Sequence, residues 1–152
     1  MGHAKIHGHV EAPIEQVFDY AVDFDHTAEW NVSVVEMKPG APLAKVGDRF
    51  AGTMKFVGRV YEGEGEVIAI ERPIMFAFVS SSPMGGHQNW TSHLTPAGNG
   101  TDIDSEIDYE VPLGFVGAFA DKLFVERQVQ KMLDQSRDNF IALVEQRALQ
   151  PV

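Results

Sequence analysis

The stretch VEAPIEQVFDYAVDFDHTAEW, residues 10–30, joins the end of a strand to two short helical segments. Pro13 suits the first turn of a helix, because the N–H that proline lacks has no partner there in any helix. Apolar residues then recur at helical spacing, which predicts a helix over about residues 13–21: Ile14, Val17, Phe18 and Ala21. We expect DFDHTAEW to form a second short helix or turn, whose Phe24 and Trp30 close one end of the domain.

The segments on either side of this stretch alternate as strands do. Before it, Ala4, Ile6, Gly8 and Val10 share one face of a predicted strand, and His3, Lys5, His7 and His9 share the other. After it, six more strands are predicted over residues 32–111, with turns at PMGG and AGNG. YEGEGEVIAIE places Glu62, Glu64 and Glu66 on one face. TDIDSEIDYEV likewise places Asp102, Asp104, Glu106 and Asp108 on its outward face. We therefore expect one antiparallel sheet with an acidic face toward water.

The last segment, PLGFVGAFADKLFVERQVQKMLDQSRDNFIALVEQ, is predicted to be helical and to cover the other face of the sheet. It carries two apolar stripes that are slightly out of phase: Val116, Phe119 and Leu123, then Val129, Met132, Leu133, Phe140 and Val144. The shift near Val125 indicates a bend or a separate short helical turn. The predicted order is strand, two short helices, six strands and a long helix, which is an α+β fold.

Composition narrows the class of protein. The 152 residues, 44% of them hydrophobic, suit a single domain over residues 1–152. No run approaches the roughly 18 apolar residues that a transmembrane segment needs, and MGHAKIHGHV lacks the apolar stretch of a secretion signal, so we expect a cytoplasmic protein. There is no cysteine, which excludes disulfides and thiolate chemistry. A net charge of −10 argues against binding to nucleic acid or to an anionic membrane.

Four stretches carry a resemblance to a known family: residues 10–30, KVGDRF, HLTPAGNGTDI, and the final helical segment from PLGFVGAFADKL onward. Together they resemble the START-like (SRPBCC) helix-grip superfamily, which includes the Bet v 1-like fold. Within it, the chain is most similar to the polyketide cyclase/dehydrase and lipid-transport group. The resemblance implies a curved sheet wrapped around a long C-terminal helix, with a deep pocket between them for lipids, sterols, hormones or aromatic polyketides. Only some members of the superfamily are catalysts.

The alternation within each strand and the periodicity of the final helix indicate which side chains face the interior. The candidate ligand-binding residues are taken from these inward-facing positions: Met54, Phe56, Tyr61, Phe76, Phe78, Gln88, Trp90, Ser92, Tyr109, Phe119 and Leu123. Aromatic rings with a few polar groups suit an apolar ligand pocket, although the same residues also suit a filled core. Gly63 and Gly65 favour a cavity by leaving room under the sheet, or else mark a bend in it.

The polar members of this set are open to two interpretations. Tyr61, Tyr109 and Gln88 are candidate anchors for a ligand, or they bond to each other and to the backbone. Trp90 is placed to stack on a flat ligand, or to pack against the final helix.

A catalytic group is harder to find, and the sequence names none. No arginine or carboxylate pair projects inward, and His87 and His93 fall on the outer phase of their strand. A register slip of one residue would bring His93 inside as a base. Although His3, His7 and His9 share a face, we expect no functional metal site there and no cofactor.

The leading hypothesis is a binding or transport protein for a small hydrophobic ligand, lipid-like or aromatic. The alternative is an enzyme of the polyketide cyclase/dehydrase (aromatase) kind that places Tyr61, Tyr109 or Gln88 against a carbonyl in the same cavity. A third hypothesis is a partner-binding module that uses the acidic face. The sequence leaves open whether the chain forms a homodimer.

Overall fold

The computed structural model describes residues 2–38, 43–56, 58–83, 85–110 and 122–149. Seven strands and the helices follow the predicted order, with a 3₁₀ turn η1 between the two short helices. Their bounds are β1 Gly2–Val10, α1 Ile14–Val22, η1 Phe24–His26, α2 Thr27–Trp30, β2 Val34–Met37, β3 Arg49–Phe56, β4 Arg59–Glu71, β5 Met75–Ser81, β6 His87–Ala97, β7 Gly100–Glu110 and α4 Lys122–Leu149.

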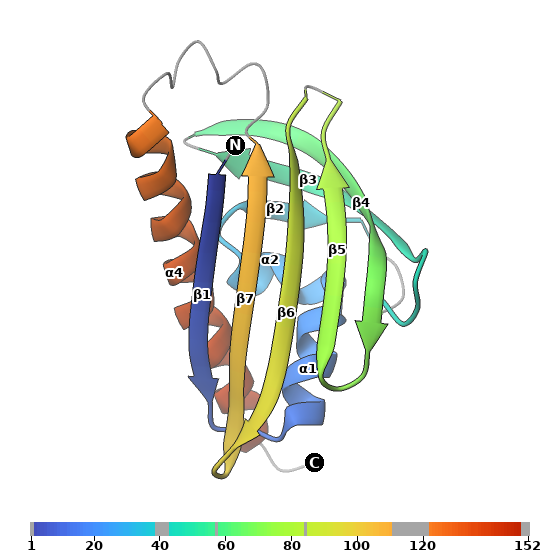
Figure 1. The fold of residues 1–152 in the computed structure, drawn as a ribbon, viewed down its shortest axis with the longest axis vertical. Coiled ribbons are helices and arrows are strands. Elements are labelled where there is room, and N and C mark those ends of the chain that lie inside the picture. Colours follow the sequence, from blue (N-terminus) through green and yellow to red (C-terminus); the bar gives the residue numbers. More distant parts are fainter. Residues whose placement is uncertain (1, 39–42, 57, 84, 111–121, 150–152) are drawn as a thin grey trace.

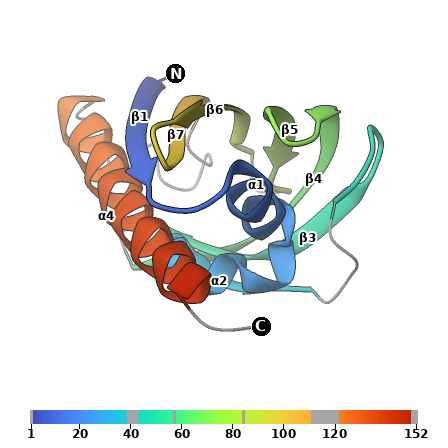
Figure 2. The ribbon, with the colours of Figure 1, turned by 90° about the horizontal axis from the view of Figure 1, so that it is seen from below.

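All seven strands form one antiparallel sheet in the order β1-β7-β6-β5-β4-β3-β2. Every neighbouring pair is consecutive in sequence except β1 and β7. The sheet curls strongly, and α4 runs along the open side of the curl while α1 and α2 lie inside it (Figures 1 and 2). This is the helix-grip fold that the sequence predicted. The part of the last predicted segment that holds Val116 and Phe119 lies outside the described residues.

The first helix forms as its sequence predicts. Pro13 is the N-cap residue of α1, and the helix buries Val17, Phe18 and Val22 against the sheet. The Phe18 ring meets the Phe76 ring edge-on, with centroids 5.9 Å apart. α1 lies beside α4 inside the curl, with the Tyr20 ring 5.6 Å from the Phe140 ring of α4, and it therefore limits the space that remains under the sheet.

Aromatic rings fill the concave side near β3, β5 and β6. Phe24 of η1 lies edge-on to Phe50 and Phe78, at centroid distances of 4.7 and 5.5 Å. Phe78 stacks on Trp90 at 5.8 Å with nearly parallel planes. Trp30 lies edge-on to Phe140 of α4 at 5.1 Å. Phe24 and Trp30 thus tie the short helical segments both to the sheet and to α4.

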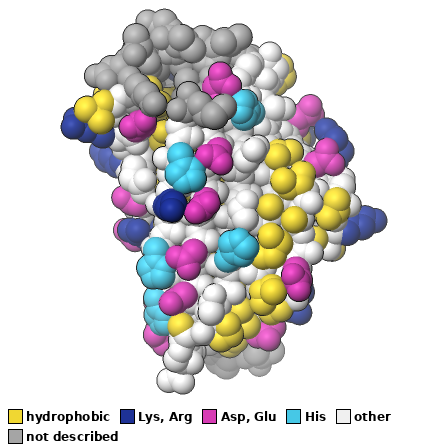
Figure 3. Space-filling model, viewed as in Figure 1, with side chains coloured by type: hydrophobic (Ala, Val, Ile, Leu, Met, Phe, Trp, Pro, Cys, Tyr) yellow, Lys and Arg dark blue, Asp and Glu magenta, His cyan; other side chains and the backbone are white. Residues whose placement is uncertain are grey.

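The convex face carries charge, as predicted, but its charges are paired across strands. Lys5 of β1 lies 3.5 Å from Glu106 of β7. Three histidines of β1 each place Nδ1 within 2.6–2.7 Å of an aspartate of β7: His3 with Asp108, His7 with Asp104 and His9 with Asp102. Histidines and carboxylates therefore alternate over one half of this face, while hydrophobic side chains gather over the other half (Figure 3).

Two details of register decide which side chains face inward. β6 pairs with β5 and β7 without a slip, so Trp90 and Leu94 are buried and His93 is exposed. The alternative in which His93 enters the interior is therefore wrong. In β4, the register shifts between Val67 and Ala69, which leaves Ile68 half-exposed. This irregularity interrupts the alternation that the sequence pattern showed.

Candidate functional site

A cavity of about 120 Å³ lies between the curled sheet and α4, near the ends of β3, β5, β6 and β7. We call it the mouth cavity. Its rim consists of exposed residues at strand ends, among them Lys55, His87 and Glu110. Its deeper wall is apolar and includes Trp90 and Ile107 of the sheet, with further side chains from α4: Val129, Met132 and Leu133.

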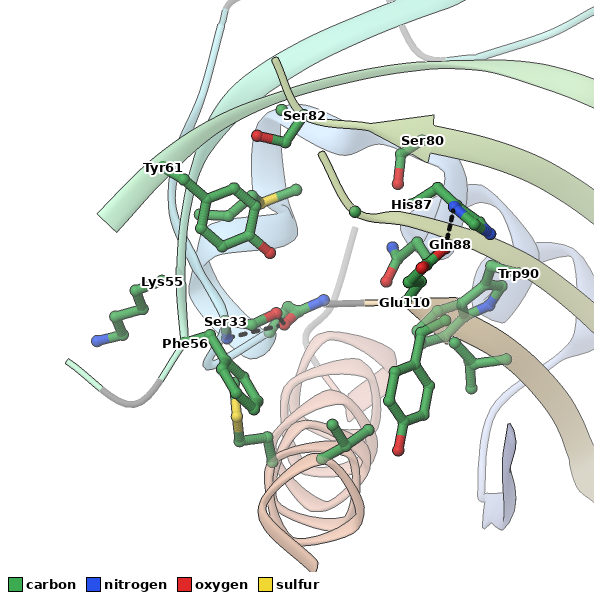
Figure 4. A pocket seen from close by; sticks show the side chains of 18 of the residues that line it. Ser33, Lys55, Phe56, Tyr61, Ser80, Ser82, His87, Gln88, Trp90 and Glu110 are labelled. Atoms are coloured by element: carbon green, nitrogen blue, oxygen red, sulfur yellow. Dashed lines mark hydrogen bonds and ion pairs between the residues drawn. The ribbon is translucent and has the colours of Figure 1, made fainter. Parts of the chain in front are cut away.

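Polar side chains are concentrated between the rim and the apolar wall (Figure 4). Ser80 projects from β5 and Gln88 from the start of β6, and both line the cavity. Within the described part of the chain, the side chains of Ser80 and Gln88 form no hydrogen bond. Donors and acceptors that line a cavity without a protein partner are available to a ligand or to water.

Two tyrosines line the same cavity, Tyr61 from β4 and Tyr109 from β7. Burial raises the pKa of Tyr61. Burial also raises the pKa of Tyr109, and the negative charge of Glu126 adds to the effect. Both phenols therefore keep their proton at neutral pH, because even an unperturbed phenol has a pKa near 10. The Tyr109 ring also lies against Gly2 of β1, so closely that a Cβ on Gly2 would overlap its hydroxyl.

The residues predicted from sequence are divided between several places. Six of them line the mouth cavity: Met54, Phe56, Tyr61, Gln88, Trp90 and Tyr109. Phe76 and Ser92 line a second cavity, described below, and Phe78 belongs to the aromatic cluster around Phe24. Leu123 is 52% exposed on α4 and lines neither cavity. Phe119 lies outside the described residues.

The structure adds lining residues that the sequence reasoning did not select. Ser80 follows Phe76 and Phe78 at the spacing of two, so the strand alternation could have found it. Ser136 lies four residues after Met132 on the inward stripe of α4, and helical periodicity could have found it as well. Ser33 lies in the irregular segment between α2 and β2, where no periodicity indicates which way a side chain points.

The two glycines considered in the sequence have different roles. Gly63 lines the mouth cavity, and a Cβ placed there would meet only Met54 and the Ser81 carbonyl, at 3.5 Å or more. Gly65 does not enlarge the cavity. A Cβ there would overlap the Phe50 ring and the Val79 carbonyl oxygen, so Gly65 allows these groups to approach the backbone closely.

A second hollow of about 60 Å³ lies beside the mouth cavity, farther along α4, and we call it the apolar cavity. It is bounded by β1, β6, β7 and α4 through mainly hydrocarbon side chains, including Ile6, Leu94, Ile103, Phe140 and Ile141. Three of its polar neighbours are bonded to each other: the Trp90 indole N–H donates to Ser92 Oγ at 2.8 Å, and Ser92 Oγ lies 2.6 Å from Ser105 Oγ. The Trp30 indole N–H, from another lining residue, has no hydrogen-bond partner among the described residues.

Of the charged groups considered for catalysis, two arginines pair with carboxylates away from the mouth cavity, and His87 lies at its rim. Arg49 lies 3.7 Å from Glu66, and Arg72 donates two hydrogen bonds of 2.8 Å to Asp19, which holds the pKa of that carboxyl below its ordinary value. His87 is 3.3 Å from Glu110 at the exposed rim. Among the described residues, no arginine lines the mouth cavity.

This fold and this cavity define the class: a helix-grip protein with a hollow between its curled sheet and its long helix. The chain belongs to the polyketide cyclase/dehydrase and lipid transport family, whose model matches residues 1–145. A search of curated proteins found no match.

Solved structures share the fold at low sequence identity. A Chromobacterium violaceum protein aligns at TM-score 0.75 and 17% identity, covering 95% of this chain and 99% of its own. A conserved protein from Geobacillus kaustophilus aligns at TM-score 0.76 and 13% identity, covering 95% and 96%. The di-domain ARO/CYC StfQ from the steffimycin biosynthetic pathway aligns at TM-score 0.71 and 9% identity, covering 96% of this chain and 50% of StfQ.

In the part of the chain that the structure describes, no helix has both the length and the apolar character required to cross a membrane.

Proposed function

We propose that this protein binds a small amphipathic ligand in the mouth cavity, with an apolar body against α4 and a hydroxyl or carbonyl group toward the rim. The observation that carries the proposal is the pairing of an apolar wall with the side chains of Ser80 and Gln88, which form no hydrogen bond to any described residue. Ligand sites are commonly built in this way, from hydrocarbon surface with a few polar groups that fix orientation.

The size of the cavity favours a small ligand. Its volume of about 120 Å³ is near the roughly 150 Å³ of an engineered apolar cavity, in another protein, that binds benzene. Pockets for drug-sized molecules reach roughly 300–1,000 Å³. A single substituted ring or a short acyl chain fits this shape, whereas a multi-ring polyketide would require the sheet and α4 to separate.

Titration calorimetry with 4-propylphenol tests the proposal. Met132→Trp places a large ring in the cavity and should abolish binding, while Lys131→Trp adds the same ring on an exposed position of α4 and should leave binding unchanged. Absence of binding to the unmodified protein across phenols and short fatty acids, or equal binding by both variants, would refute the proposal. If binding is observed, native mass spectrometry of the purified protein, followed by organic extraction, would identify the natural ligand.

A second candidate is an enzyme of the cyclase/dehydrase kind, and the observation in its favour is that Tyr61 and Tyr109 line one cavity as protonated phenols. The compound recovered by extraction should be incubated with the protein and with the Tyr61→Phe and Tyr109→Phe variants. Turnover that is lost while binding is kept would favour the enzyme. A loss of affinity without any turnover would favour the carrier.

A further inference from the structure

The mouth cavity and the apolar cavity lie end to end along α4. Helix positions from Val129 to Ser136 line the first, and positions from Leu133 to Ile141 line the second. Three residues line both cavities and so form the partition between them: Trp90, Leu133 and Ser136.

Two of the three partition residues are fixed by hydrogen bonds. The Trp90 N–H donates to Ser92 Oγ, and its ring stacks on Phe78. Ser136 Oγ donates to the Met132 carbonyl at 2.8 Å and accepts from the Val32 N–H at 3.0 Å. Leu133 has no polar group and is held by packing alone. It is therefore the partition residue whose size can change without breaking a hydrogen bond.

The chemistry of the apolar cavity indicates what would enter it. Its walls are mainly hydrocarbon, and the guanidinium of Arg137 beside it is engaged by Asp138 at 3.1 Å and Asp134 at 3.6 Å. Trp30 also lines the cavity, and within the described residues its buried indole N–H has no hydrogen-bond partner. The Ser92 and Ser105 hydroxyls bond to each other. An alkyl tail suits such a hollow because most of its lining is hydrocarbon, whereas a carboxylate would lose its hydration there and, among the described lining residues, find no cation free to pair with it.

We propose that Leu133 sets the length of ligand that the protein accepts, by closing the apolar cavity to the tail of a ligand seated in the mouth cavity. The inference rests on the proposed function, since it assumes a ligand in the mouth cavity. It names the ligand class as a single hydroxylated ring with a short alkyl chain. It also assigns to Leu133 a specificity that the lining of the mouth cavity alone does not provide.

Calorimetry with a series of 4-alkylphenols, from methyl to octyl, tests this assignment. Each methylene that becomes buried raises affinity about fourfold. In the unmodified protein the affinity should rise with chain length and then level off where the tail meets Leu133. In Leu133→Ala it should keep rising for longer chains, and two further buried methylenes would give about a fifteenfold gain. Ile141→Ala enlarges only the apolar cavity and should not move the levelling point.

The outcomes separate the two proposals. The same levelling point in the unmodified protein and in Leu133→Ala would overturn the role of Leu133, and so would a smooth rise without any levelling, while either result would leave the proposed function standing. Absence of binding by every phenol would overturn both. Leu133→Phe enlarges the partition and should move the levelling point to shorter chains, so the test remains decisive even if the alanine variant does not fold.

Discussion

Replacing Ser92 with alanine should lower the free energy of unfolding by about 2 kcal/mol. Ser92 is 2% exposed, and its hydroxyl lies at the centre of a chain in which Trp90 donates to Ser92 at 2.8 Å and Ser92 meets Ser105 at 2.6 Å. The truncation leaves an indole N–H and a hydroxyl without partners, and each such group costs roughly 1–3 kcal/mol. The cavities beside Trp90 can admit water to the N–H, which keeps the total near the lower end. Ser105→Ala removes one of the two hydrogen bonds and should cost about 1 kcal/mol.

Urea denaturation followed by circular dichroism measures both changes, and a double-mutant cycle isolates the indole bond. In the Trp90→Phe background there is no indole N–H that could lose its hydrogen bond. Ser92→Ala should therefore destabilise that variant by at least about 0.5 kcal/mol less than it destabilises the unmodified protein. An equal loss in both backgrounds would refute the reasoning, because the bond between Trp90 and Ser92 would then contribute nothing. A larger loss of unfolding free energy for Ser105→Ala than for Ser92→Ala would mean that Ser105, and not Ser92, is the centre of the hydrogen-bond network.

Three further predictions follow from other parts of the structure. Gly63→Val should weaken 4-propylphenol binding in calorimetry while leaving the melting temperature nearly unchanged, since a Cβ has room there only toward the cavity. Phe78→Ala should lower the urea-derived unfolding free energy by about 3–5 kcal/mol, because the ring packs among other rings in the core. The hydrogen bonds that the His9 ring donates to Asp102 and Glu11 raise the pKa of His9, so Asp102→Asn should lower that pKa in an NMR titration. The stability that these bonds give is complete below about pH 6.5 and should be lost as pH rises through the raised pKa.

The sequence predicted the fold well because its signals were local and repeated. Alternation in residues 4–10 and in β7 gave the buried face of the sheet, and Pro13 gave the start of α1. The pairing of His3, His7 and His9 with aspartates was not predicted, because it depends on the register between strands that lie about a hundred residues apart. The pattern within one strand shows which face is buried, but it does not show which residue of a distant strand lies opposite.

The candidate site was predicted less completely than the fold. The alternation of inward-facing and outward-facing residues in each strand selected Tyr61, Gln88 and Trp90, which the structure brings together. Strand alternation does not show whether the inward-facing side chains leave a cavity or fill it. Phe78 was selected by the same rule, although it packs among other rings. The partition at Leu133 depends on how the sheet and α4 approach each other, which is a property of packing rather than of periodicity.

The pairing of β1 with β7 sets the order in which the chain can assemble. His3 and Asp108 are 105 positions apart, so closing the sheet joins nearly the first residue of the fold to the last of its strands. Contacts this distant in sequence slow folding, because a long loop must close before they stabilise anything. During synthesis β1 has no partner strand until residue 110 has left the ribosome. A nascent chain halted before β7 would therefore expose the alternating apolar residues of β1, and chaperone capture should be strongest at that stage.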